Sequence, residues 1–206
     1  MSTPPTALPA DFASAAEELR GATLRSDLAV REIAPPDRIA PHSIAFAAGV
    51  REGTGPDLES VLDSPAGAGR FVLMHDPDSA DEWGGDFRIV CYAQAPLELE
   101  IGVDPFISDV AWSWLVDALE LREAKYTYIS GTATKVLSSS FGALEARGDG
   151  AQIELRASWT PLGGSLAAHA EAWSELLCLL AGLPQQEGVA SLTQQRVRAQ
   201  RSAVIS

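Results

Sequence analysis

The stretch DPFISDVAWSWLVDALELR, residues 104–122, decides how the rest of this sequence is organised. It predicts a helix in which Asp104 caps the first free N–H groups and Pro105 takes the first helical position. Apolar residues gather on two opposite sides of this helix. One side holds Trp112, Leu115, Val116 and Leu119, and the other holds Val110, Trp114, Ala118 and Leu121. A helix that is apolar on two opposed faces is normally buried, so we expect both faces to be covered.

Two parts of the chain resemble each other. Residues 70–121 and 126–181 both read as strand, strand, Pro-Leu and helix, and both helices contain the triplet Ala-Trp-Ser. Chance similarity in an Ala/Ser/Leu-rich chain remains an alternative. A true repeat would give two ββα units, with both long helices on one face of a mainly antiparallel sheet. The Trp112 side would then lie on the sheet, and the Trp114 side would need a separate cover, either the N-terminal helix or a partner chain.

Hydrophobic periodicity supplies the remaining elements of the prediction. Strands are expected at 28–33, 43–50, 70–75, 86–95, 126–136 and 151–159, and further helices at 11–25 and 166–181. Ser165 is the expected cap of the last helix, and Gly131 marks a possible bulge. The sequence therefore predicts an α+β fold with a mainly antiparallel sheet of about 5–6 strands, long helices on one face and an N-terminal helix. Residues 11–184 are expected to form one domain, between a flexible N-terminus at 1–10 and a disordered tail at 185–206.

The charge of the chain limits its partners. The 206 residues carry a net charge of −13 at pH 7. An acidic body of this kind repels phosphate backbones, so nucleic-acid binding by the folded part is not expected. Residues 188–206 hold Arg196, Arg198 and Arg201 and no acid, which leaves a weak route to nucleic acid through the tail.

Cysteine usage and the lack of targeting signals predict a cytoplasmic protein. Cys91 falls in an alternating strand pattern and Cys178 in a leucine-rich helix, so buried free thiols are favoured over a disulfide. The N-terminus has no signal-peptide pattern, and the longest apolar run, 176–183, is too short to span a membrane. The chain contains no CxxC, HExxH or Cys/His cluster, so neither a metal nor a cofactor is expected.

Several runs of residues resemble a known family. They are HDP (75–77), FRIVCY (87–92), DPFISDVAWSWLVDAL (104–119), RASWTP (156–161) and EAWSELLCLLAGLP (171–184). Together they resemble an actinobacterial family catalogued as domain of unknown function number three thousand. The resemblance implies a bacterial cytosolic protein and brings no activity, cofactor or catalytic residue. Its relatives are often encoded near a ribonuclease-D-like gene, which suggests a link to RNA metabolism.

The sequence offers one candidate for chemistry. His75 and Asp76 end a predicted strand, and Asp78, Asp81 and Glu82 follow them. A histidine beside carboxylates can act as a general base, and grouped carboxylates can bind a cation. The simpler interpretation is that Asp76-Pro77 is a turn whose acids are solvated.

Two tryptophans are candidates for binding. Trp112, Trp159 and Trp173 fall on predicted core positions. Trp114 and Trp83 are not needed in that core. We therefore expect a possible interface at Trp114, Val110, Ala118, Leu121 and Trp83.

The residues and their spacing leave three functions open. The preferred one is a non-enzymatic protein-interaction or adaptor module, with a protein partner or a second copy of the chain bound to the apolar helix face. The second is an accessory factor in RNA metabolism. The third is a hydrolytic enzyme that uses His75 and the nearby acids.

Overall fold

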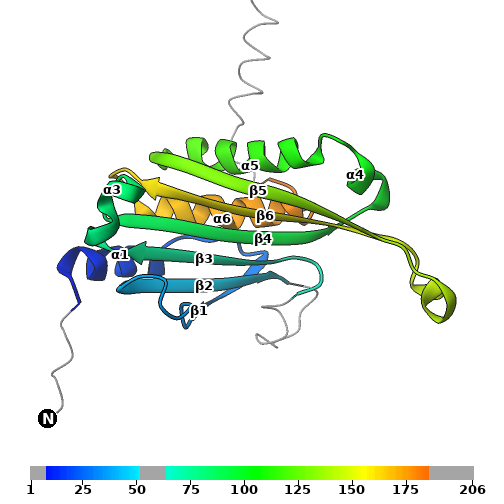
Figure 1. Ribbon diagram of the computed structural model, residues 1–206, viewed down its shortest axis with the longest axis horizontal. Helices are drawn as coiled ribbons and strands as arrows, with labels where there is room; N and C mark the ends of the chain where they lie inside the picture. Colours follow the sequence, from blue (N-terminus) through cyan, green and yellow to red (C-terminus); the bar gives the residue numbers. More distant parts are fainter. Residues whose placement is uncertain (1–7, 52–63, 186–206) are drawn as a thin grey trace, which may run out of the picture.

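Six strands form one antiparallel sheet in the computed structural model, which describes residues 8–51 and 64–185 (Figure 1). The strand order is β1-β2-β3-β4-β6-β5. The strands are β1 (Leu28–Ile33), β2 (His42–Val50), β3 (Ala68–His75), β4 (Phe87–Leu97), β5 (Tyr126–Ser138) and β6 (Gly150–Pro161). The sheet is open, so β1 and β5 are edge strands.

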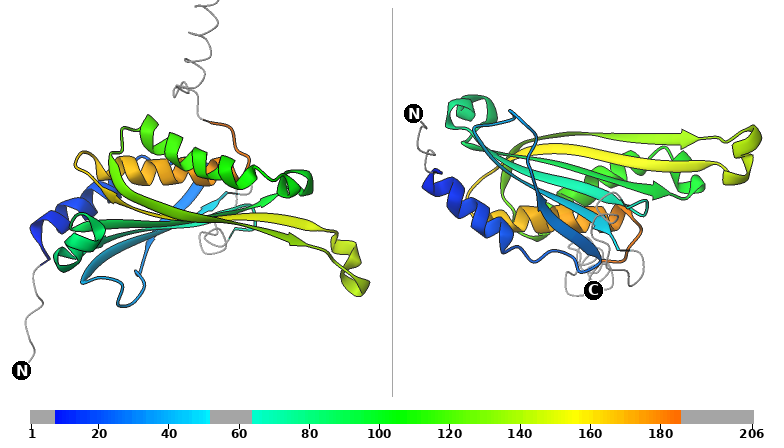
Figure 2. Two further views of the ribbon diagram at one scale, coloured as in Figure 1. Left: turned by 45° about the horizontal axis from the view of Figure 1, so that its top comes forward. Right: turned by 90° about the horizontal axis from the view of Figure 1, so that it is seen from below.

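Three helices pack on the sheet, and α5 and α6 lie on the same face (Figure 2). They are α1 (Ala10–Arg20), α5 (Ile107–Leu121) and α6 (Leu166–Leu180). Shorter helical segments are η1 (Pro77–Ser79), α3 (Ala80–Trp83), α4 (Leu99–Val103) and η2 (Gly142–Arg147). The predicted α+β fold, with its antiparallel sheet and N-terminal helix, is confirmed.

The main core lies between the helices and the odd-numbered residues of β4 and β6. Ile89, Cys91 and Ala93 are fully buried there, as is Trp159 opposite Ile89. Burying a large apolar side chain contributes about 1.5–3 kcal/mol, so this alternation holds the helices on one face. Cys91 and Cys178 are both buried and unpaired, as predicted, and burial raises the pKa of each thiol to about 12.

The two predicted hairpins, β3–β4 and β5–β6, lie next to each other because β4 pairs with β6. This central pairing runs from Ile89 opposite Trp159 to Leu97 opposite Ala151. The outer strands β3 and β5 flank the central pair. Both hairpins therefore belong to one sheet.

On both β3 and β5, a tryptophan side chain packs over a glycine of the strand. A Cβ on Gly69 of β3 would lie 3.0 Å from Cζ2 of Trp173, and one on Gly131 of β5 would lie 2.6 Å from Cζ3 of Trp112. Both contacts are too close for a side chain, so glycine lets each indole approach the strand backbone. Gly131 was expected at a bulge. The bulge instead lies between Thr127 and Ser130, and Gly131 serves the indole contact.

Helix α5 differs from its prediction in its start and in its cover. It begins at Ile107, because Asp104 Oδ1 accepts the N–H of Phe106 (2.8 Å) and so stabilises the turn before the helix. Its buried stripe is Ile107, Ala111, Leu115, Ala118 and Leu119. Helix α6 packs against α5, whereas α1 packs against α6. The helix packed on α5 is therefore α6, while α1, one of the two covers expected for the Trp114 side, packs on α6.

The end of one helix and the cap of another also differ from expectation. Helix α1 ends at Arg20, with Gly21 following, and does not reach Arg25. The Ser165 side chain makes no capping hydrogen bond to α6. Except for residues 8–10 and 185, the predicted flexible ends lie outside the described residues. Within the described part of the chain, no helix is long and apolar enough to cross a membrane.

Candidate functional site

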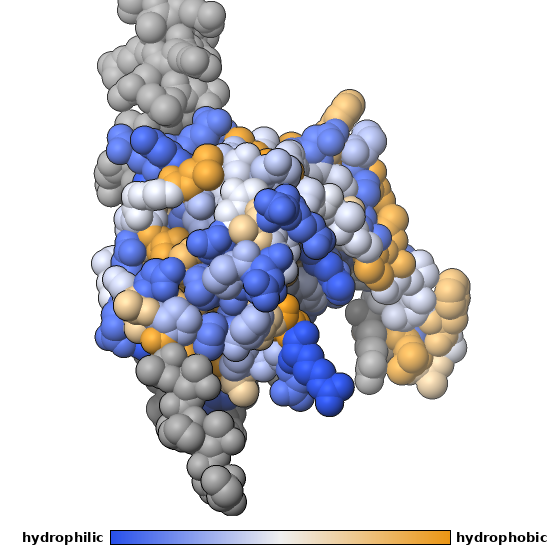
Figure 3. Space-filling model, turned by 60° about the vertical axis from the view of Figure 1, so that its left-hand side comes forward, coloured by the Kyte–Doolittle hydropathy of each residue, from blue (hydrophilic) through white to orange (hydrophobic). Residues whose placement is uncertain are grey.

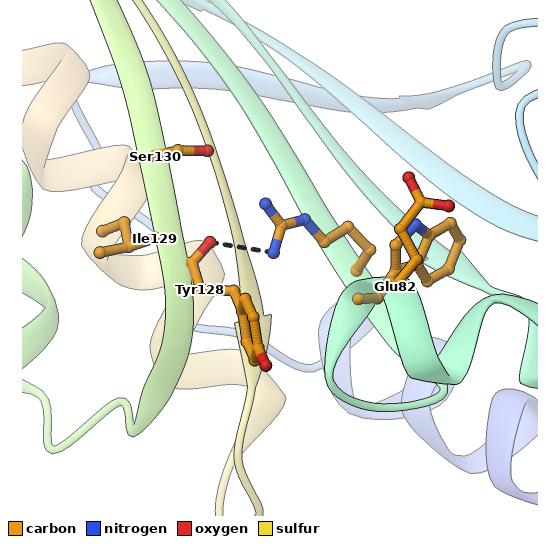
Figure 4. A pocket seen from close by; sticks show the side chains of 6 residues that line it. Glu82, Tyr128, Ile129 and Ser130 are labelled. Carbon is orange, nitrogen blue, oxygen red and sulfur yellow. Dashed lines mark hydrogen bonds between the residues drawn. The ribbon is translucent and has the colours of Figure 1, made fainter.

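A cleft of about 390 Å³ opens on the sheet face opposite the helices, between α3 and the bulged start of β5 (Figure 4). Its lining consists of Glu82, Trp83, Arg88, Tyr128, Ile129 and Ser130. The cleft is an open hollow on the surface and not an enclosed cavity. Glu82 and Tyr128 lie on opposite walls, and the Arg88 guanidinium reaches across the sheet between them.

Arg88 is held by neutral oxygen atoms. Its Nη1 donates to the Tyr128 carbonyl (3.0 Å) and to Thr160 Oγ1 (3.1 Å), and its Nη2 donates to Ser158 Oγ (2.7 Å). The Thr160 hydroxyl in turn donates to the Trp83 carbonyl, which ties α3 to the sheet. Burial lowers the pKa of Arg88 below its ordinary value. The arrangement therefore fixes a partly desolvated cation at the base of the cleft.

Tyr128 has a left-handed backbone with φ of 49°. This conformation is costly for a bulky residue, and such strain concentrates at functional sites. It is held in place because the Tyr128 ring packs directly on Gly84, where an added Cβ would meet the ring. The residue sits at the bulge in β5, which separates the Thr127 and Ser130 pairs with β6. Strain and bulge together turn the Tyr128 carbonyl toward Arg88.

Trp83, a predicted binding residue, lines the cleft and also packs on a second, smaller core. That core consists of Ala45, Val72 and Met74 on the open face of the sheet. Part of the indole thus has a structural role. The remaining surface contributes to the cleft wall.

The side chains of His75 and Asp76 have different partners. His75 is buried among the rings of Phe12, His42 and Phe87, and the carboxylate within ion-pair distance of it is Asp11 of α1, at 3.5 Å. Asp76 instead caps η1, where its carboxylate accepts the Asp78 N–H and the Ser79 hydroxyl. The structure does not bring the two side chains together as an acid–base pair.

The predicted Trp114 face is only partly accessible. Ala118 is buried, Trp114 and Leu121 are half-buried, and Val110 is exposed at the margin. Trp114 packs on the edge of the main core. This face therefore offers much less apolar surface than the sequence implied.

The larger apolar exposure lies on the far end of the β5–β6 hairpin, here called the arm. The arm projects beyond the rest of the sheet and carries η2 at its tip (Figure 1). Val136, Leu137, Phe141 and Leu144 are exposed along it. Nearby, α4 packs on the arm through Gly102, which touches Ala151 and Leu137. On the side of the molecule shown in Figure 3, hydrophilic residues dominate and hydrophobic ones lie in scattered groups.

No three His, Cys, Asp or Glu side chains in the described ranges are grouped so that they could hold a metal ion. The sequence did not single out Arg88, Tyr128 or Ser158. Their meeting depends on the pairing of β4 with β6 and of β6 with β5, and no local pattern reports it.

Comparison with known proteins gives one relative and one family. Over 124 residues the chain is 31% identical to the tRNA(Met) cytidine acetate ligase of Syntrophotalea carbinolica. The match covers 53% of this chain, and the chain spans only 30% of that protein's length. No solved structure matches the chain. Residues 8–190 match the family described as protein of unknown function, DUF3000, and the chain therefore belongs to this family.

Proposed function

We propose that this protein is a non-enzymatic protein-interaction module whose contact surface is the free edge of β5 together with the arm. The observation that carries this proposal is the edge itself. β5 extends from Tyr126 to Ser138, and among the described residues no strand pairs with its outer side. An edge of this length presents a row of backbone donors and acceptors to which an extended partner segment can add.

β5 lacks most of the features that protect edge strands from pairing. Proteins block such edges with charges, prolines, bulges or very short strands. The bulge between Thr127 and Ser130 protects one end only, and pairing with β6 is regular from Ser130 to Ser138. Lys135 is the one charged residue of the strand, and its ammonium donates to the Asp104 carbonyl (2.8 Å). Because the protein as a whole is acidic, a second acidic chain is repelled less by this nearly uncharged strand than by charged surface.

Apolar residues extend this surface beyond the strand. Phe141 at the arm tip is 80% exposed, and Val136 on β5 is 45% exposed. Exposed apolar residues occur singly on most proteins, but their grouping beside a free edge is typical of a contact surface.

The test compares two pairs of substitutions of exposed apolar residues, one pair on the proposed surface and one pair outside it. Val136→Lys with Phe141→Lys places charge on the proposed surface. Leu162→Lys with Leu8→Lys alters apolar residues that are 45% and 58% exposed elsewhere. We expect the wild type and the Leu162/Leu8 variant to bind the same partner, with cross-links to the arm, and the Val136/Phe141 variant to lose it.

Tagged protein purified from its host, with cross-linking and mass spectrometry, gives the partner and the contact residues. A sizing column with light scattering detects a second copy of the chain. Identical partners, cross-links and mass for both variants would reject the proposal.

A second candidate, an accessory role in RNA metabolism, is favoured by one row of residues. Successive strand pairs align these residues across the open face of the sheet: Arg31, Ala47, Arg70, Tyr92, Arg156 and Thr132. Arginines beside an aromatic ring on a sheet can hold single-stranded RNA, and the Arg156 guanidinium lies 5.4 Å from the centre of the Tyr92 ring. The similarity to a tRNA(Met) cytidine acetate ligase points the same way.

The net charge of the chain and the ion pair between Arg156 and Glu154 weigh against this role. Salt-dependent binding of tRNA that is weakened by Arg156→Gln would favour it.

A further inference from the structure

The cleft contains a cation without an anionic partner. Arg20, Arg25, Arg122 and Arg156 each pair with a carboxylate. Within the parts of the chain that the structure describes, no carboxylate lies within ion-pair distance of Arg88. A partly desolvated charge without a counter-ion is unfavourable, and a bound anion would relieve that cost.

Arg88 retains donors for such an anion. A guanidinium has five N–H donors, and the bonds to Tyr128, Thr160 and Ser158 use three of them. The remaining donors belong to a side chain that lines the cleft, beside the Ser130 hydroxyl. The three existing bonds fix the plane of the guanidinium. The donors left over, Nε–H and one Nη2–H, are therefore held in a fixed plane and can bind an oxyanion.

The walls of the cleft suit an apolar or aromatic body on that anion. Tyr128 and Trp83 supply two rings beside the arginine, whereas the Ile129 side chain points away from it and packs on the main core. The cleft has room for a ligand the size of a substituted benzene ring. The strained backbone of Tyr128, held by its ring on Gly84, keeps one wall in place without a ligand.

We propose that the Arg88 cleft binds a small organic carboxylate, with the carboxylate on Arg88 and an apolar body between Tyr128 and Trp83. A monoanion fits better than a phosphate ester. Glu82 lines the same cleft, and the whole chain carries a net charge of −13, so a second negative charge on the ligand is repelled. This site lies on the open sheet face, and the inference does not rest on the proposed protein interaction.

The test uses three probes of similar shape with the full-length protein: benzoate, phenyl phosphate and benzamide. Titrations followed by nuclear magnetic resonance report on the Arg88 side-chain N–H signals and on the backbone of Tyr128. We expect benzoate to shift these signals and to bind more tightly than phenyl phosphate. Benzamide has the same shape without the charge and should not bind measurably.

Three variants separate the proposed site from general charge effects. Arg88→Gln should weaken benzoate binding at least about tenfold, because it removes the charge-assisted hydrogen bonds to the carboxylate. The control Arg156→Gln removes another arginine of the open face and should leave benzoate binding unchanged. Glu82→Gln keeps every Arg88 hydrogen bond and should tighten benzoate binding roughly threefold at low salt, because it removes a repelling charge.

If Arg88→Gln impairs folding, the Glu82→Gln variant still tests the proposal. Equal binding of benzoate and benzamide, stronger binding of phenyl phosphate, or no gain in Glu82→Gln would each overturn the proposal.

Discussion

Acid should destabilise this protein through His169, a buried histidine of α6. The indole Nε1–H of Trp159 donates to His169 Nδ1 (3.0 Å), which leaves the proton of the neutral ring on Nε2. That nitrogen is buried without a hydrogen-bond partner among the described residues. Adding a proton at Nδ1 would break the bond from Trp159 and place a charge in the core. Burial therefore lowers the pKa of His169 from 6.5 to about 4, against a smaller opposing effect of Glu18.

The pH window and the size of the effect follow from linkage. The unfolded chain takes up this proton more readily than the folded one, so the stabilisation is complete above pH 6.5 and is lost as pH falls toward 4. From about pH 7.5 to about pH 5 the loss attributable to His169 is about 2 kcal/mol. The full difference in pKa corresponds to about 3 kcal/mol.

Urea unfolding of the wild type and of His169→Gln across this pH range measures the effect. Glutamine can still accept the Trp159 N–H but does not titrate, and all other ionisable groups are shared by the two proteins. We expect the free energy of unfolding of the wild type to fall more steeply with acid than that of the variant. Parallel pH dependences would show that His169 is not held neutral by the core.

Three other substitutions test the packing. Gly131→Ala should lower the free energy of unfolding by about 1–3 kcal/mol, because the new Cβ would lie 2.6 Å from the Trp112 ring. An unchanged melting temperature would contradict this contact. Glu175→Gln should lower the free energy of unfolding in urea by about 3 kcal/mol, because the buried Glu175 carboxylate bridges Arg25 and Arg122. A loss below about 1 kcal/mol would mean that the ion pairs are solvated. Trp114→Ala should lower the free energy of unfolding by about 2 kcal/mol, which is less than the effect of truncating a fully buried aromatic side chain. The mass in solution should not change. Dissociation of an oligomer would instead show that Trp114 is an interface residue.

Local patterns were enough to predict most of the elements. The bounds of β1 agree with the sequence-based expectation, and the other strands differ from it by a few residues at their ends. This agreement has a simple cause. Alternation of apolar and polar residues directly reports which side of a strand is buried, and that alternation is present in β4 and β6. The similarity of the two halves likewise indicated the two hairpins and the common face of α5 and α6.

The short helices were missed because tertiary contacts hold them. Helix α3 is tied to the sheet by the hydrogen bond from Thr160 to the Trp83 carbonyl, and α4 packs its Gly102 on Ala151. Neither segment has a periodic apolar face long enough to be recognised. The helix that packs on α5 could not be predicted for a related reason. The apolar side of α5 can be read from the sequence, but the helix that packs on it cannot.

The sequence by itself determined the strands, the long helices, the buried cysteines and the acidic character of the chain, because each depends on the neighbours of a residue along the chain. Only the tertiary structure decided that β4 lies beside β6 and that β5 is left at the edge. Those choices depend on the packing of segments far apart in sequence, and a single chain offers several strand orders with the same alternation. The Arg88 cleft and the free edge of β5 both follow from that strand order, so they appear only once the sheet is assembled.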